Sequence, residues 1–116
     1  MIQIAIRKSI ESLNILSRLH WGKRHRKGKD WEKEIWAALN GRIPKAKGRM
    51  KVKIMSIRKR LLDTDNLVGG AKGLRDALKR LGIIVDDSPK HCEFEYVQKQ
   101  QPIGDYTLIE IEEVKE

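Results

Sequence analysis

The stretch RMKVKIMSI at residues 49–57 constrains the fold more than any other part of the chain. Its basic and apolar side chains alternate, with Arg49, Lys51 and Lys53 on one side and Met50, Val52 and Ile54 on the other. Successive side chains of a β-strand point to opposite faces of the sheet. The pattern therefore predicts a strand that has one buried face and one wet, basic face.

Other periodic stretches predict the remaining elements. Alternation predicts strands at 1–6, 92–98 and 106–114, and the short apolar run at 83–85 is read as one more strand. Apolar residues at helical spacing predict helices over 30–40 and 67–81. Gly22 and Gly28 interrupt the basic run at 18–29, and this run is therefore predicted to be a loop. The prediction is a single mixed α/β domain over residues 1–116, with a small mixed β-sheet and two main helices.

Charge is distributed unevenly along the chain. Residues 18–60 hold sixteen of the 25 lysines and arginines but three of the 16 acidic residues, and the formal net charge is +9. Such a bias indicates a polyanionic partner or an anionic membrane surface. No apolar run approaches the roughly 18 residues of a membrane span, and the N-terminal stretch lacks the features of a signal peptide. The lone Cys92 cannot form an internal disulfide. We expect a soluble cytoplasmic protein.

Aspartates recur at two places in this basic chain. Asp63 and Asp65 are two positions apart, and Asp86 and Asp87 follow the apolar run. On an extended segment the first two side chains would point to the same face, where two carboxylates can bind one hard cation such as Mg²⁺. The alternative is structural, because Asp65 or Asn66 is a suitable helix cap and Asp86–Asp87 begins a turn-forming sequence.

The basic residues also have two interpretations. Lys72 is either a solvated helix lysine or a positive charge that reaches a phosphate. Trp21 is the better candidate for an exposed aromatic side chain that stacks on a base, whereas Trp31 shares a face with Ile35 and Leu39. The residues expected to contact DNA are Arg18, His20, Trp21, Lys23, Arg24, Arg26, Lys27, Lys29, Lys51, Lys53, Arg58, Lys59 and Arg60.

Residues 63–87 together resemble the RusA family of Holliday-junction resolvases. The family pattern is Asp-x-Asp-Asn, a lysine, Asp-Ala-Leu, a glycine, an apolar run and Asp-Asp. The corresponding segments here are DTDN at 63–66, Lys72, DAL at 76–78, Gly82, IIV at 83–85 and DD at 86–87. In the family the lysine follows the second aspartate by four positions, whereas seven separate Asp65 from Lys72. On a continuous helix both spacings leave the lysine near the same face.

The resemblance implies a small, dimeric, Mg²⁺-dependent endonuclease of mixed α/β fold, of a kind often encoded by phages and prophages. Such enzymes resolve four-way DNA junctions by paired symmetric nicks in recombination and repair. Carried over to this chain, the metal ligands are Asp63, Asp65 and Asp87, with Asp86 as second choice, and Lys72 is a catalytic residue.

The expected setting follows from the same resemblance. Mg²⁺ is the expected cofactor, with Mn²⁺ as a substitute. The expected partners are branched DNA and a second copy of the chain, with no membrane and no small-molecule substrate, in a bacterial or phage-infected cell. Two other functions stay open: a non-catalytic nucleic-acid-binding module of the same fold, and a broader branched-DNA or flap nuclease.

Overall fold

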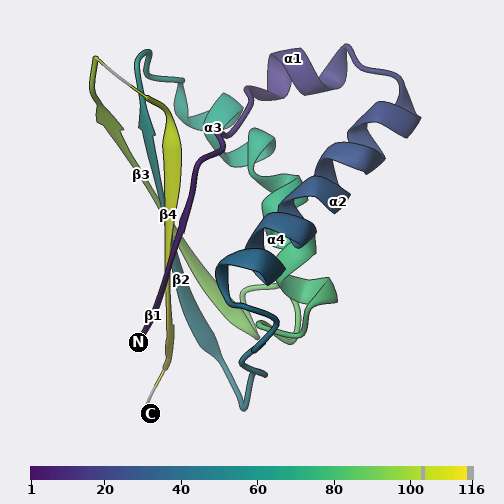
Figure 1. Ribbon diagram of the computed structural model, residues 1–116, viewed down its shortest axis with the longest axis vertical. Coiled ribbons are helices and arrows are strands. Elements are labelled where there is room, and N and C mark those ends of the chain that lie inside the picture. Colours follow the sequence, from purple (N-terminus) through teal and green to yellow (C-terminus); the bar gives the residue numbers. More distant parts are fainter. Residues whose placement is uncertain (103, 115–116) are drawn as a thin grey trace.

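A mixed β-sheet forms one layer of the molecule, and helices cover one of its two faces (Figure 1). The computed structural model describes residues 1–102 and 104–114. Its elements, in chain order, are β1 (Ile2–Ile6), α1 (Leu13–Ser17), α2 (Trp21–Ala38), β2 (Met50–Arg58), α3 (Thr64–Gly70), α4 (Lys72–Arg80), β3 (Cys92–Gln100) and β4 (Tyr106–Glu113). The predicted mixed α/β class is confirmed.

The strand order within the described sheet is β1-β4-β2-β3. β4 pairs antiparallel with both β1 and β2, whereas β2 and β3 run parallel. A parallel pair needs a crossover connection, and α3 and α4 provide it. The alternation at 49–57 is confirmed, because Met50, Val52 and Ile54 are all buried beneath the helices. The strands predicted at 1–6, 92–98 and 106–114 also form, with small shifts at their ends.

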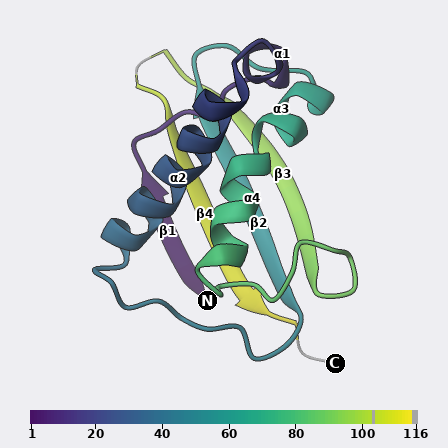
Figure 2. The ribbon, with the colours of Figure 1, turned by 90° about the vertical axis from the view of Figure 1, so that its right-hand side faces the viewer.

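The predicted loop at 18–29 is wrong, because α2 runs without interruption from Trp21 to Ala38. Gly28 does not break this helix; it is the point where α2 meets α4. An added Cβ at Gly73 would lie 3.3 Å from the Cα of Gly28. A glycine in a helix lowers its stability by roughly 0.5–1 kcal/mol, and here close packing between the two helices compensates. Figure 2 shows α2 and α4 side by side over the sheet.

The segment predicted as one helix at 67–81 belongs to two helices. Ala71 lies between them, as the C-cap of α3 and the N-cap of α4. α3 begins after Asp63 and ends at Gly70. Gly69 and Gly70 allow the start of α1 and the residues before it to approach closely. An added Cβ at Gly69 would lie 2.6 Å from Leu13 Cδ2, and one at Gly70 would collide with the carbonyl oxygen of Glu11. These glycines therefore serve packing.

The apolar run at 83–85 does not form the predicted strand. Ile83 and Ile84 are buried in the core, whereas Val85 is exposed. Gly82 ends the preceding helix in a left-handed conformation with φ of +78°, as its position after the apolar stripe predicts. Burial of a short apolar run can thus occur in a turn as well as in a strand. The sequence QPIGD at 101–105 predicts a turn, and Ile103 of this stretch lies outside the described residues.

One hydrophobic core lies between the sheet and the helical layer. Ile54, Ile109, Leu74 and Leu78 are fully buried in it, and Trp31 and Ile35 of α2 pack on the same cluster. Cys92 is buried there too, and burial raises the pKa of its thiol to about 11. No helix among the described residues is long and apolar enough to cross a membrane.

Candidate nucleic-acid interface

The motif aspartates Asp63 and Asp65 differ in what they contact. Asp63 caps α3: its Oδ1 accepts a hydrogen bond of 2.9 Å from the backbone N–H of Asn66, and its Oδ2 accepts one of 3.0 Å from Asn66 Nδ2. Asn66 Oδ1 in turn accepts from the backbone N–H of Asn14 at 3.0 Å. The sequence therefore builds a cap that also fastens α1 to α3.

Asp65 lies one residue into α3 and is exposed. Its carboxylate has no hydrogen-bond or ion-pair partner within residues 1–102 and 104–114. The prediction that both carboxylates point to one face of an extended segment is wrong, because Thr64 begins a helix. Residues two apart on a helix point about 200° away from each other. Asp65 is therefore the aspartate of this pair that is free to contact a ligand.

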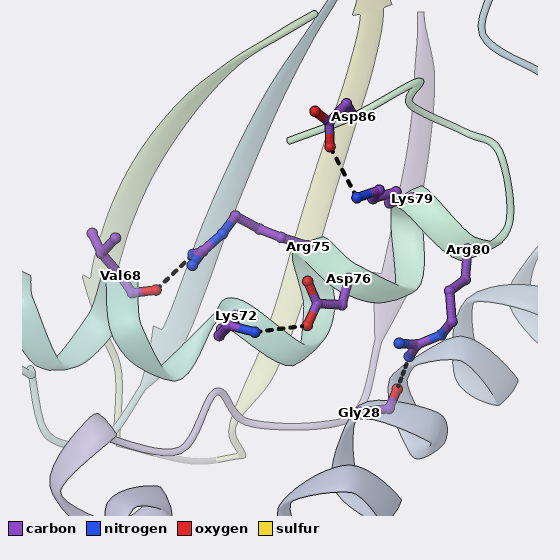
Figure 3. A network of polar contacts seen from close by, with 8 residues as sticks. All are labelled: Gly28, Val68, Lys72, Arg75, Asp76, Lys79, Arg80 and Asp86. Atoms are coloured by element: carbon purple, nitrogen blue, oxygen red, sulfur yellow. Dashed lines mark hydrogen bonds and ion pairs between the residues drawn. The ribbon is translucent and has the colours of Figure 1, made fainter. Parts of the chain in front are cut away.

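The later pair, Asp86 and Asp87, follows the far end of α4. Asp86 forms an ion pair with Lys79, with Nζ and Oδ1 separated by 3.0 Å (Figure 3). The hydrogen bond from Lys79 holds the pKa of the Asp86 carboxyl below its usual value. Asp87 is exposed. α3 and the α4–β3 connection lie at opposite ends of the helical layer (Figure 1), so the two pairs of aspartates are at opposite ends of the crossover.

These positions do not form the predicted three-carboxylate site for Mg²⁺. In the part of the chain that the structure describes, no group of three or more histidine, cysteine, aspartate or glutamate residues is arranged to hold a metal ion. Asp63 is occupied as a cap, Asp86 is paired, and Asp87 belongs to another end of the molecule. The residues of one chain therefore do not fit a Mg²⁺ site built from Asp63, Asp65 and Asp87.

Lys72 begins α4 and remains accessible. Its side chain is 73% exposed, and its Nζ lies 3.2 Å from Asp76 Oδ2, one helical turn away (Figure 3). The comparison of the Asp65–Lys72 spacing with that of the family assumes one continuous helix between the two residues. That helix does not exist, because α3 ends at Gly70 and α4 begins at Lys72. Exposed ion pairs of this kind contribute at most about 1 kcal/mol, so the ammonium group can leave Asp76 for a phosphate at little cost.

The basic residues at 18–29 lie on and just before the first turns of α2. His20 caps the helix, and its Nδ1 accepts from the Gly22 N–H at 3.2 Å. The rings of Trp21 and His25 stack, with centroids 5.6 Å apart and an interplanar angle of 13°. Trp21 is 70% exposed and Trp31 is buried, so the prediction that Trp21 is the more accessible of these two tryptophans is confirmed. The exposed basic residues here are Arg18, Lys23, Arg24, Arg26 and Lys29.

A cleft of about 350 Å³ lies between these turns of α2, the segment after β1, α1, and the α3–α4 pair. We call it the α2–α4 cleft. Its charged lining residues are Lys8, Arg24, Lys27, Lys72 and Arg80, with Glu11 and Asp76 as the acidic ones. Trp21, His25 and Trp31 also line it. The fold thus brings the motif lysine and the basic run, which are distant in sequence, to one cavity.

Lys51 and Lys53 lie on the face of the sheet that the helices do not cover, and they have acidic neighbours on both sides. Lys51 stands opposite Glu93 of β3 and Glu112 of β4, and Lys53 stands opposite Glu95 and Glu110. Arg49 also lies on this side and pairs with Glu93 at 3.8 Å, and Lys99 follows Glu95 by four positions on the same face of β3. Four cations thus face four glutamates, so Lys51 and Lys53 offer a phosphate less uncompensated positive charge than the start of α2 does.

The three basic residues after β2 differ among themselves. Arg58 is a structural residue: its Nη1 donates to the carbonyl oxygen of Ile10 at 2.7 Å, and its Nε donates to that of Arg60 at 2.6 Å. Burial lowers the pKa of its guanidinium. The backbone N–H of Lys59 donates to Asp105. The side chains of Lys59 and Arg60 are exposed and remain available to a phosphate.

Three residues of the cleft were not predicted from the sequence. Lys8 lies over the Trp31 ring, 5.2 Å from its centroid. Glu11 pairs with Lys27 at 2.5 Å, and Arg80 pairs with Glu32 at 3.1 Å and donates to the carbonyl oxygen of Gly28 (Figure 3). Each contact joins residues far apart in the chain, so no local pattern indicates it.

No protein-family model matches the chain, and no curated protein matches its sequence.

Proposed function

We propose that this protein is an endodeoxyribonuclease that acts on branched DNA and resolves four-way junctions by paired nicks. The proposal rests on the resemblance of residues 63–87 to the RusA family and on one structural observation. Lys72, the lysine of the motif, lines the same cavity as Arg24 and Lys27 of the basic helix. A nuclease needs such a concentration of positive charge beside its reacting groups to hold the phosphate backbone.

Asp65 is the carboxylate of the motif that supports this proposal best. It is exposed, unpaired within the described segments, and only a short helix away from Lys72. Asp63 keeps α3 in place, so its removal would disturb the position of Asp65. The assignment of Mg²⁺ as cofactor remains part of the proposal, although the residues of one chain do not fit a three-carboxylate site.

A homodimer is the expected working form. Two matched cuts on opposite strands need two identical sites, and a twofold-symmetric dimer presents them to the twofold of a junction. The contacts to DNA are expected to be mostly phosphate contacts from α2, Lys59 and Arg60, with little reading of base sequence.

The test is cleavage of a synthetic four-way junction with Mg²⁺ by the wild type and by Asp65→Asn. Loss of a group that stabilises the transition state lowers such rates by roughly 100-fold or more, and we expect a loss of that size. Asp30→Asn is the matched control, because Asp30 is an exposed, unpaired aspartate on α2. Equal nicking by wild type and Asp65→Asn would exclude Asp65 from catalysis.

A non-catalytic nucleic-acid-binding module is the second candidate function. One observation favours it: within residues 1–102 and 104–114, no three histidine, cysteine, aspartate or glutamate side chains are arranged to hold a metal ion. It predicts salt-sensitive binding to DNA, with no nicking in Mg²⁺ or Mn²⁺. A panel that includes a flap, a nicked duplex and a junction separates a resolvase from a broader branched-DNA nuclease.

A further inference from the structure

We propose that the α2–α4 cleft holds one unpaired nucleotide of a DNA strand. The cavity of about 350 Å³ falls in the size range of small-ligand sites, about 300–1,000 Å³, and a duplex cannot enter it. The inference rests on the proposed function, because the branch point of a DNA junction is where nucleotides leave the stack most easily.

The aromatic lining of the cleft suits a base. Trp21 and His25 already stack on each other, at an interplanar angle of 13°, so a base that stacks on an outer ring face would extend this stack. Trp21 is accessible, and the apolar side chains of Leu13 and Leu16 line the same cavity. Stacking on an aromatic side chain tolerates any base, because every base has a π-face. The pair therefore suits a base of any sequence.

The charges of the cleft suit the phosphate attached to that base. Arg24 follows Trp21 by three positions, so the two side chains are neighbours on one face of α2. The Arg24 guanidinium has no ion-pair or hydrogen-bond partner among the described residues. Both acidic lining residues are already paired, Glu11 with Lys27 and Asp76 with Lys72. A phosphate at Arg24 therefore meets no uncompensated carboxylate of the cleft.

The surface outside the cleft favours a nucleotide within a strand over a free nucleotide. Lys23, Arg26 and Lys29 are exposed on the same helix and do not line the cavity. They extend the positive charge along α2 beyond the space that one nucleotide fills. Proteins that bind single strands combine this kind of basic track with aromatic stacking positions.

The experiment compares two DNAs in EDTA, so that no cutting occurs: a duplex with one bulged thymidine and the same duplex without the bulge. We expect the wild type to bind the bulged duplex about tenfold more tightly, which is the effect of stacking one base. Trp21→Ala should abolish the preference, whereas Trp21→Phe should keep most of it because the ring is retained.

Trp36→Ala is the matched control, since Trp36 is a second exposed tryptophan on α2 that does not line the cleft. It should keep the full preference for the bulge. Because Trp21 is 70% exposed, Trp21→Ala should unfold at the same denaturant concentration as the wild type, which checks that the fold is intact.

Three results overturn the inference: no preference for the bulge in the wild type, equal loss in Trp21→Ala and Trp36→Ala, or competition by free dTMP as strong as that by bulged DNA. Junction cleavage in Mg²⁺ reports separately on the proposed function. A wild type that nicks junctions without preferring the bulge contradicts only the cleft assignment. A wild type that prefers the bulge through Trp21 and never nicks contradicts only the nuclease proposal.

Discussion

The two basic stretches of the sequence, 18–29 and 49–60, lie in different electrostatic surroundings. The first becomes the exposed start of α2, where Arg24 is unpaired among the described residues and lines a cleft. The second becomes mainly β2, where Lys51 and Lys53 each stand between two glutamates. Equal densities of lysine and arginine in the sequence thus produce one cationic surface and one on which glutamates balance the cations.

The difference follows from the geometry of the two elements. A strand inside a sheet has two neighbours less than about 5 Å away, and their side chains decide the local charge. A helix on the surface of a layer leaves one face without partners. The main contacts of α2 are with α4 and β1, so the cations on its outer face stay uncompensated.

The largest expected effect comes from Gly70→Ala, which tests whether the fold around the α2–α4 cleft depends on the close packing of α3 against Glu11. An added Cβ would collide with the Glu11 carbonyl oxygen. Overpacking in a tight contact costs about 1–3 kcal/mol, and we expect the upper end because backbone must move. Urea unfolding measures it. Gly22→Ala is the control, because its added Cβ would meet only His20 Nδ1, at an ordinary contact distance of 3.6 Å, and it should lose no stability. Unchanged stability of Gly70→Ala would mean that the approach of 10–13 to α3 is looser than described.

A smaller effect separates the two basic regions directly. Arg24→Ala should lower the slope of log affinity for duplex DNA against log salt by about 1, the loss of one phosphate contact. Lys53→Ala should leave the slope unchanged, because Glu95 and Glu110 already neutralise that position. Equal slopes for Arg24→Ala and the wild type, or a reduced slope for Lys53→Ala, would reverse the comparison.

The smallest expected effect distinguishes Asp63 from Asp65 at the start of α3. Asp63→Ala should lower the free energy of unfolding by about 1 kcal/mol, because α3 loses its N-cap. Asp65→Ala should stay within about 0.5 kcal/mol of the wild type, as an exposed residue without partners. Denaturant midpoints measure both, and equal losses would show that Asp65 also has a structural partner.

The sequence predicts the sheet well and the connections poorly. Alternation at 50–54 and the stripe through Trp31 and Ile35 depend on burial, which is periodic and therefore visible along the chain. The extension of α2 through Gly28 is not visible, because its cause is contact with Gly73 of another helix. The run at 83–85 is apolar enough for a strand, yet its isoleucines pack in the core without pairing.

The candidate site shows the same division. A helix cap in the DTDN segment is one of the two interpretations that the sequence leaves open, but the cap is Asp63 and not the expected Asp65 or Asn66. The accessible Trp21 follows from its place in a basic run. The pairing of Glu11 with Lys27 and the glutamates beside Lys53 depend on tertiary contacts and strand register, which no single segment encodes.

The position of β4 has a consequence for how the chain is made. The last strand in sequence lies inside the sheet, between β1 and β2, so β1 has no other strand to pair with until residues near Ile111 are available. Pairing between chain ends that are this distant in sequence forms slowly. During synthesis β1 must therefore wait, with its hydrogen-bonding groups unpaired, until β4 has left the ribosome.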